Sequence, residues 1–236
     1  MKKIILLILV ALSLSTGLFA QVQNTDQRTI ATKIAEFLMK LPAQNSADHD
    51  KLMAELSAMG EPALTGIAAN LMPPGQGNDL ASRYAISGLV KFLAKGNDQG
   101  KMKASADAIC KSIESSKYDE VKDFLLQELQ YVAGNESVAT AGSILLNERL
   151  CDPAARVLVR INTEQSNKAM LDVLPKAALK QQLILVEALG QTKYIPATEK
   201  IRELASSGNN EMKKVAFRAL AESEHTAPHL LGESGH

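Results

Sequence analysis

Apolar residues recur along most of this chain with the spacing of one helical face. In residues 210–221 they are Met212, Val215, Ala216, Ala219 and Leu220, at i, i+3, i+4, i+7 and i+8. This spacing predicts an amphipathic helix with one apolar stripe. No run of residues alternates with period two for long enough to indicate a strand. A helix of this kind needs a neighbour to cover its stripe.

The same pattern predicts a series of short helices separated by polar or glycine-containing breaks. They span residues 29–41, 48–58, 61–71, 80–94, 100–115, 118–132, 137–147, 152–161, 167–174, 179–189, 197–206 and 210–221. Residues 73–78, Pro-Pro-Gly-Gln-Gly-Asn, form the clearest loop. We expect N-terminal helices in residues 21–78, a regular array in residues 79–222, and a disordered or truncated tail in residues 223–236.

A repeated spacing decides the expected architecture. Near the ends of five predicted helices, one apolar residue follows another by four positions, and the second members are Leu89, Leu129, Ile161, Leu189 and Leu220. They lie 40, 32, 28 and 31 residues apart. The register at Ile161 is the weakest, because the local pattern can slide by two residues. Spacings near 30 suit two short helices per repeat, so we expect an all-α fold, an α-solenoid of stacked antiparallel helix pairs.

Three segments resemble the second helices of HEAT-like repeats. They are Cys151-Asp152-Pro153-Ala154-Ala155-Arg156, Glu187-Ala188-Leu189-Gly190, and Lys213-Lys214-Val215-Ala216-Phe217-Arg218-Ala219-Leu220. The resemblance extends from about residue 121 to residue 221 and implies a right-handed superhelix. Such motifs are degenerate, so they indicate an architecture and not a function.

A second resemblance is more specific. A predicted export signal, the segment Met72-Pro73-Pro74-Gly75, and the segment Asn147-Glu148-Arg149-Leu150-Cys151-Asp152-Pro153-Ala154-Ala155-Arg156 occur together in this chain. As a set they resemble the helical N-terminal region of secreted bacterial proteins that carry a 3-keto-disaccharide hydrolase domain. Nothing here matches that aromatic-rich β-sandwich domain, so the resemblance carries over no catalytic residue.

The first twenty residues have the layout of a secretory signal peptide. Lys2 and Lys3 precede an apolar run over residues 4–12, and small or polar residues lead to Ala20. We expect cleavage after Ala20 and a periplasmic or secreted protein. The alternative is a membrane anchor, but the run is shorter than the roughly 20 residues that span a bilayer. No later segment is apolar enough to span one.

Export bears on the two cysteines, Cys110 and Cys151, because disulfides persist outside the cytoplasm. We expect a disulfide between them, and closing that loop stabilises a fold by roughly 4 kcal/mol on the chain-entropy model. The alternative is a pair of buried free thiols. A catalytic thiol is disfavoured, since neither cysteine has a neighbouring histidine in the sequence.

Charge and composition limit the kinds of partner that we expect this chain to bind. Lys and Arg number 26, as do Asp and Glu, so the net charge is zero and no long-range field attracts nucleic acid. Aromatic residues make up 4% of the chain and Trp is absent, while hydrophobic residues reach 46%. We therefore expect a folded helical protein with a protein partner and no nucleic acid.

Candidate chemistry is sparse, and we expect no catalytic, cofactor or metal site. Asp48, His49 and Asp50 are adjacent on a helix start and diverge around its axis, so we interpret the first two as a cap and first-turn charge. His225 and His229 have a zinc-compatible spacing if helical, but Pro228 argues against a helix there. Gly75-Gln76-Gly77 follows no strand and is not a phosphate loop.

Three functional hypotheses follow. We favour an exported, non-catalytic scaffold that binds a protein or an extended ligand on its solenoid surface. The alternative is an accessory module of a carbohydrate-processing protein. A lyase acting on bilin pigments, as some HEAT-like proteins are, has no residue here to support it. After Ala221 the chain lacks an obvious cap, so we expect the last helix pair to expose an apolar end and the native array to continue.

Overall fold

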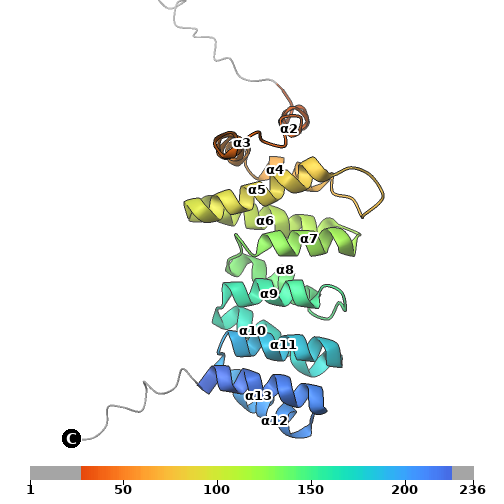
Figure 1. The fold of residues 1–236 in the computed structure, drawn as a ribbon, viewed down its shortest axis with the longest axis vertical. Coiled ribbons are helices and arrows are strands. Elements are labelled where there is room, and N and C mark those ends of the chain that lie inside the picture. The colour runs from red at the N-terminus through yellow and green to blue at the C-terminus, as the bar shows by residue number, and fades with distance from the viewer. Residues whose placement is uncertain (1–27, 225–236) are drawn as a thin grey trace, which may run out of the picture.

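The computed structural model describes residues 28–224, which form helices and turns and contain no strand (Figure 1). The expected all-α class is confirmed. The first helices are α2 (Ile30–Leu38), α3 (Ser46–Met59), α4 (Glu61–Ala68), α5 (Leu80–Gly96), α6 (Gln99–Ser115) and α7 (Asp119–Leu129). The later ones are α8 (Val138–Ile144), α9 (Cys151–Ile161), α10 (Glu164–Val173), α11 (Leu179–Gln191), α12 (Thr198–Ser207) and α13 (Asn210–Glu224). There are also three short 3-10 helices in the described residues. The first, η1 (Asn135–Ser137), precedes α8, η2 (Leu174–Lys176) follows α10, and η3 (Ile195–Ala197) precedes α12.

Side-chain caps set several helix starts. Asn45 accepts a hydrogen bond from the Asp48 amide at 2.9 Å, so Asn45 and not Asp48 caps α3, and Asp48 lies in the first turn. Thr163 accepts from the Ser166 amide and closes a capping box, which starts α10 three residues earlier than the apolar pattern predicts. At the other end, Asn162 adopts a left-handed conformation and terminates α9.

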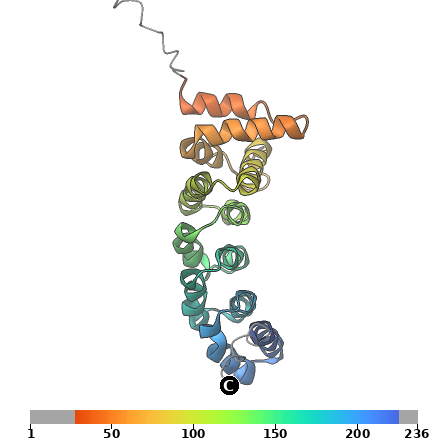
Figure 2. The same cartoon turned by 90° about the vertical axis from the view of Figure 1, so that its left-hand side faces the viewer.

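The helices from α4 onward form two columns. Helices α5, α7, α9, α11 and α13 contact one another in order and make the inner column, while α4, α6, α8, α10 and α12 make the outer column. Figure 2 shows that the two columns bow together, with the inner column on the concave side. Successive inner helices begin at Leu80, Asp119, Cys151, Leu179 and Asn210, which is within one residue of the spacing that the sequence predicts.

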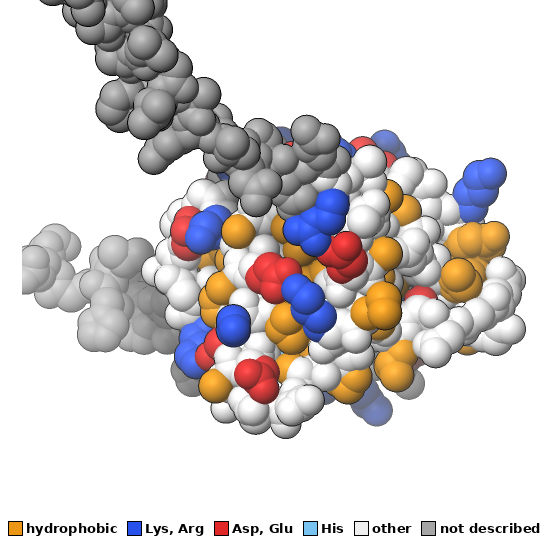
Figure 3. Space-filling model, turned by 90° about the horizontal axis from the view of Figure 1, so that it is seen from above, with side chains coloured by type: hydrophobic (Ala, Val, Ile, Leu, Met, Phe, Trp, Pro, Cys, Tyr) orange, Lys and Arg blue, Asp and Glu red, His pale blue; other side chains and the backbone are white. Residues whose placement is uncertain are grey.

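Helices α2 and α3 run across the N-terminal end of both columns (Figure 2). Figure 3 shows this end face, on which charged side chains are interspersed with apolar ones. Lys40 pairs with Glu55 at 2.6 Å, and Arg28 pairs with Glu36. The described N-terminal end is therefore covered by a mixed, partly charged surface.

One continuous core extends from Ile34 to Ala219 and includes residues on both sides of the loop that joins α4 to α5. Small residues let neighbouring helices approach closely. A Cβ added to Gly190 of α11 would lie 2.6 Å from the Cα of Ala219 on α13. Among the described residues, no helix has the length and hydropathy needed to cross a bilayer.

Some expectations fall outside the described residues. These are the signal peptide of residues 1–20, its cleavage after Ala20, and the tail beyond residue 224. The expected tail begins slightly too early, because α13 continues through residues 223 and 224. In that last turn the Ser223 hydroxyl is buried and donates to the Ala219 carbonyl at 2.9 Å.

Candidate ligand-binding groove

Two adjoining hollows mark the concave side of the inner column. One, of about 420 Å³, lies between the α4–α5 loop and α7, and the other, of about 670 Å³, lies between α7 and α9. Asp123, Gln127 and Arg149 line both. The shared residues make the two hollows one groove, which we call the α7 groove.

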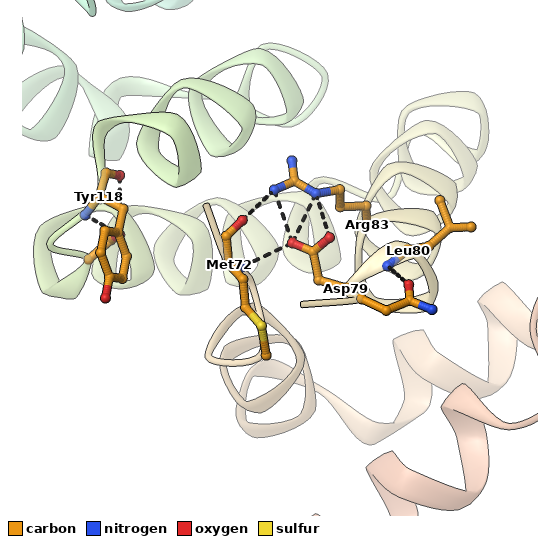
Figure 4. Close-up of polar contacts among 7 residues, drawn as sticks. Met72, Asp79, Leu80, Arg83 and Tyr118 are labelled. Atoms are coloured by element: carbon orange, nitrogen blue, oxygen red, sulfur yellow. Dashed lines mark hydrogen bonds and ion pairs between the residues drawn. The ribbon is translucent and has the colours of Figure 1, made fainter. Parts of the chain in front are cut away.

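The α4–α5 loop forms one wall of this groove and is held in place by an ion pair (Figure 4). Nε of Arg83 donates to both carboxylate oxygens of Asp79 at 3.0 Å. The Arg83 guanidinium also donates to the Met72 carbonyl at 3.0 Å, and the Met72 amide donates to Asp79 at 2.9 Å. Both backbone groups of Met72 are thus fixed to the start of α5.

This ion pair is partly shielded from water, with 14% of the Asp79 side chain and 27% of the Arg83 side chain exposed. Burial by itself raises the pKa of Asp79, but hydrogen bonds from Arg83 and the Met72 amide and the nearby positive charge outweigh it. The net result is a pKa below the ordinary value for an aspartate. The Asp79 carboxylate therefore stays charged at neutral pH.

Arg83 also connects the loop to α7. Its guanidinium carbon lies 4.6 Å from the centroid of the Phe124 ring, within the range of a cation–π contact. Phe124, Glu120 and Asp123 of α7 line the same hollow as Pro73 and Pro74 of the loop. One arginine thus positions the loop against two helices of the inner column.

The opposite wall is the turn between α8 and α9. The side-chain amide nitrogen of Asn147 donates to Asp119 at 3.1 Å, and its side-chain oxygen Oδ1 accepts from the backbone amides of Arg149 and Leu150. The Arg149 guanidinium donates to Glu120 at 2.8 Å. The N-terminal turn of α7 therefore orders this wall as well, and it directs Arg149 into the groove.

The floor between α7 and α9 is polar. It is lined by Asp123, Gln127, Gln130, Tyr131, Arg149, Asp152, Pro153, Arg156 and Arg160. Arg156 pairs with Asp152 at 2.9 Å while 65% of its side chain stays exposed. Tyr131 is 43% exposed, and the Lys91 ammonium lies 5.5 Å from its ring centroid. These side chains offer several hydrogen-bond donors and one aromatic edge to an extended ligand.

A separate hollow of about 310 Å³ lies at the ends of α4 and α6, beside Tyr118. Tyr118 is 44% exposed, and its backbone amide donates to the Ser116 hydroxyl at 3.3 Å (Figure 4). Small apolar and hydroxyl side chains make up most of its lining. It is smaller than the α7 groove and offers fewer charged groups.

The two cysteines do not form the expected disulfide in the structure: both are buried free thiols. They belong to helices of different columns. Cys110 lies on α6 of the outer column, with its thiol beside Ser137 and Thr140, whereas Cys151 begins α9 of the inner column. Burial raises the pKa of both thiols, to about 11 for Cys151, where the Asp152 charge adds to the effect.

A thiol titration tests this arrangement. We expect protein purified without reductant to release two thiols per chain after unfolding in denaturant, because the chain has two cysteines and both are free. In the native protein at pH 8, reaction should be slower by on the order of 100-fold, since little thiolate forms when burial raises the pKa. Release of no thiol after unfolding would contradict the free-thiol structure and restore the Cys110–Cys151 bridge.

The histidines that the sequence offers as metal ligands do not form a metal site within the described residues. His49 lies 6.0 Å, centroid to centroid, from the Tyr84 ring and 3.3 Å from the Asp50 carboxylate. Within residues 28–224, no three His, Cys, Asp or Glu side chains gather as metal ligands would. His225 and His229 lie outside the described residues, as does His236.

The sequence motifs account for part of the groove. The segments from Met72 to Gly75 and from Asn147 to Arg156 carried the resemblance to secreted proteins, and the structure brings both to the α7 groove. Arg83, Tyr131 and Arg160 also line the groove but belong to neither segment. The i,i+4 pair of Asp79 and Arg83 at a helix start was the available signal for the first of these.

Comparison with known proteins leaves the family open. No protein-family model matches the chain, and no curated protein matches it. The crystal structure of an engineered protein has a TM-score of 0.42 and 14% sequence identity, over 82% of this chain and 97% of that one. A likeness at that TM-score carries no argument about fold or function.

Proposed function

We propose that this protein is an exported, non-catalytic scaffold that binds a protein or another extended ligand along the α7 groove. Its fold, in this proposal, is a right-handed HEAT-like α-solenoid of stacked antiparallel helix pairs. The sequential contacts along the inner column and the regular starts of its helices support that architecture. The leader of residues 1–20 supports delivery to the periplasm or the medium.

One observation carries the proposal: two hollows of the concave face join through Asp123, Gln127 and Arg149 into a single elongated groove. Its walls are ordered before any ligand arrives, by the Asp79–Arg83 pair on one side and by Asn147 on the other. Pre-ordered walls reduce the conformational entropy that binding would otherwise cost. The mixed arginine, glutamine and tyrosine lining suits an extended polar partner.

A comparative pull-down tests the groove. The exported chain, beginning at Gln21, is incubated with the native envelope fraction and medium, and captured molecules are quantified by mass spectrometry. We expect the triple variant Arg149→Ala, Arg156→Ala, Arg160→Ala to lose the specific partner. Each buried, charge-assisted hydrogen bond lost weakens binding by roughly tenfold.

A matched control separates lost contacts from lost folding. Lys168, Lys200 and Lys214, which lie on other helices, are replaced together by alanine, which removes the same charge outside the groove. Exposed ion pairs contribute roughly 0–1 kcal/mol, so both triple variants should melt close to the parent protein. Equal capture by the two variants would show that the groove is not the binding surface.

One observation favours a second candidate, an accessory module of a carbohydrate-processing protein. The two segments that resemble such proteins, at Met72 to Gly75 and Asn147 to Arg156, lie 72 or more residues apart in sequence and line the same groove. Recovery of a sugar-processing enzyme alone in the pull-down supports this candidate. Recovery of other envelope proteins supports the general scaffold.

A further inference from the structure

The two ends of the α7 groove offer different surfaces to a ligand. At the loop end, Pro73, Pro74 and Phe124 supply apolar surface. The carboxylates of Asp79 and Glu120, which line the same hollow, each accept a hydrogen bond from an arginine, at 3.0 and 2.8 Å (Figure 4 shows the first). Because those charges are compensated, the loop end favours an apolar side chain.

The α9 end of the groove carries an excess of positive charge. Three arginines line this hollow against two aspartates, so cations exceed anions by one. Asp123 accepts from the Gln127 side chain at 3.0 Å, and Asp152 is paired with Arg156 at 2.9 Å. Both aspartates therefore have partners within the protein, and the remaining charge at this end is cationic.

Arg160 is the most open of these cations. It is exposed in the last turn of α9 and has no ion pair within residues 28–224. Beside the hollow, the Lys91 ammonium lies over the Tyr131 ring and has no carboxylate partner in that part of the chain either. The pair that Arg156 makes is exposed and of small energy, so Arg156 can also turn to a ligand. Arginine binds a carboxylate through two parallel hydrogen bonds.

We propose that the ligand of the α7 groove is an extended peptide segment with an apolar side chain at the loop end and an acidic side chain against Arg156 and Arg160. This inference rests on the proposed function and names its partner class. A peptide carries apolar and acidic side chains on one backbone. An anionic polysaccharide, in contrast, has no aliphatic side chain to fill the loop end.

The spacing of the helices sets the distance between these two side chains. One hollow lies on each side of α7, and packed helices lie about 8–10 Å apart. An extended chain advances about 3.3 Å per residue. About three residues therefore separate the apolar position of the ligand from the acidic one.

Synthetic peptides test the two ends separately. The probe is Gly-Ser-Gly-Leu-Leu-Gly-Glu-Glu-Gly-Ser with an electrically neutral fluorophore, and its binding to the chain that begins at Gln21 is followed by fluorescence anisotropy. Replacing Glu-Glu with Lys-Lys should weaken binding by roughly tenfold, because attraction becomes repulsion. Replacing Leu-Leu with Ser-Ser should weaken it by roughly fivefold, because the apolar contact is lost.

Two variants assign each preference to its end of the groove. Arg156→Ala with Arg160→Ala should reduce the preference for Glu-Glu over Lys-Lys to roughly twofold or less and keep the preference for Leu-Leu. Pro73→Ser with Pro74→Ser should have the reverse effect. All four side chains lie at the surface or half-buried, so both variants should melt close to the parent protein.

The matched control is Lys168→Ala with Lys214→Ala, which removes the same charge outside the groove and should keep both preferences. Equal binding of the three peptides would overturn this inference. So would a preference for Glu-Glu that survives in the double arginine variant. Heparin that binds more tightly than the probe, and only when both arginines are present, would assign the groove to an anionic polysaccharide and overturn the peptide partner.

The peptide assay and the envelope pull-down fail independently. Capture that depends on the groove, together with no preference for the acidic peptide, would overturn the partner class and leave the scaffold proposal in place. Capture that is equal in the groove variant and its control would overturn the scaffold proposal itself, on which the partner class depends.

Discussion

Replacing Leu126 with alanine is expected to lower the free energy of unfolding by about 2–5 kcal/mol, the usual cost of a cavity at a fully buried leucine. Leu126 lies on α7 and is 0% exposed, at the centre of the inner column between α5 and α9. Few side chains in this fold can relax into the space, because each helix is already packed on both sides. The measurement is denaturant unfolding followed by circular dichroism.

The control for this variant is Leu146→Ala. Leu146 is the same residue type, on the α8–α9 turn, and is 50% exposed, so its loss should change stability by no more than about 0.5 kcal/mol. Because each helix pair contacts only its neighbours, hydrogen exchange should show loosening around α7 before α13. A Leu126→Ala protein as stable as the Leu146→Ala protein would contradict the packing of α5, α7 and α9.

Replacing Gly190 with alanine is expected to destabilise the protein by about 1–3 kcal/mol, through overpacking and not through a cavity. The added Cβ would lie 2.6 Å from both the Cα and the Cβ of Ala219. A backbone neighbour cannot move aside as a flexible side chain can, so α11 and α13 must separate. Thermal melting, with exchange measured in α13, reports this separation.

Gly96→Ala provides the matched control, since Gly96 is the last residue of α5 and a Cβ there meets nothing within 4 Å. The same substitution at this helical position should be neutral or stabilise by about 0.4–1 kcal/mol, because alanine restricts the unfolded chain. Opposite signs at the two glycines would establish the close approach of α11 to α13. Equal effects would contradict it.

The α7 groove depends on contacts that local sequence patterns do not specify. Asn147 and Arg149 belong to a motif, but their roles depend on Asp119 and Glu120, which lie 28 and 29 residues earlier. Arg83 meets Phe124 across two helices and more than forty residues of sequence. Periodicity gives the face of a helix on which a residue lies, but it does not give the residue it meets on another helix.

The cysteines make the same point. The expected export and the presence of two cysteines predict a bridge between Cys110 and Cys151, and in the structure both are buried free thiols on helices of different columns. A disulfide requires Cα atoms within about 7 Å and converging side chains. That geometry depends on which column each helix joins, and local sequence does not specify it.

By itself, the sequence determined the all-helical class, the approximate helix limits and the regular spacing of the inner helices. These depend on apolar periodicity, capping residues and breaks, which act over a few residues. The tertiary structure alone decided which residues meet at the α7 groove, that both thiols are buried, and that Phe217 is exposed on the last inner helix. The physical reason is that amphipathic helices share one local pattern, whereas burial and contact depend on the helix that packs against each stripe.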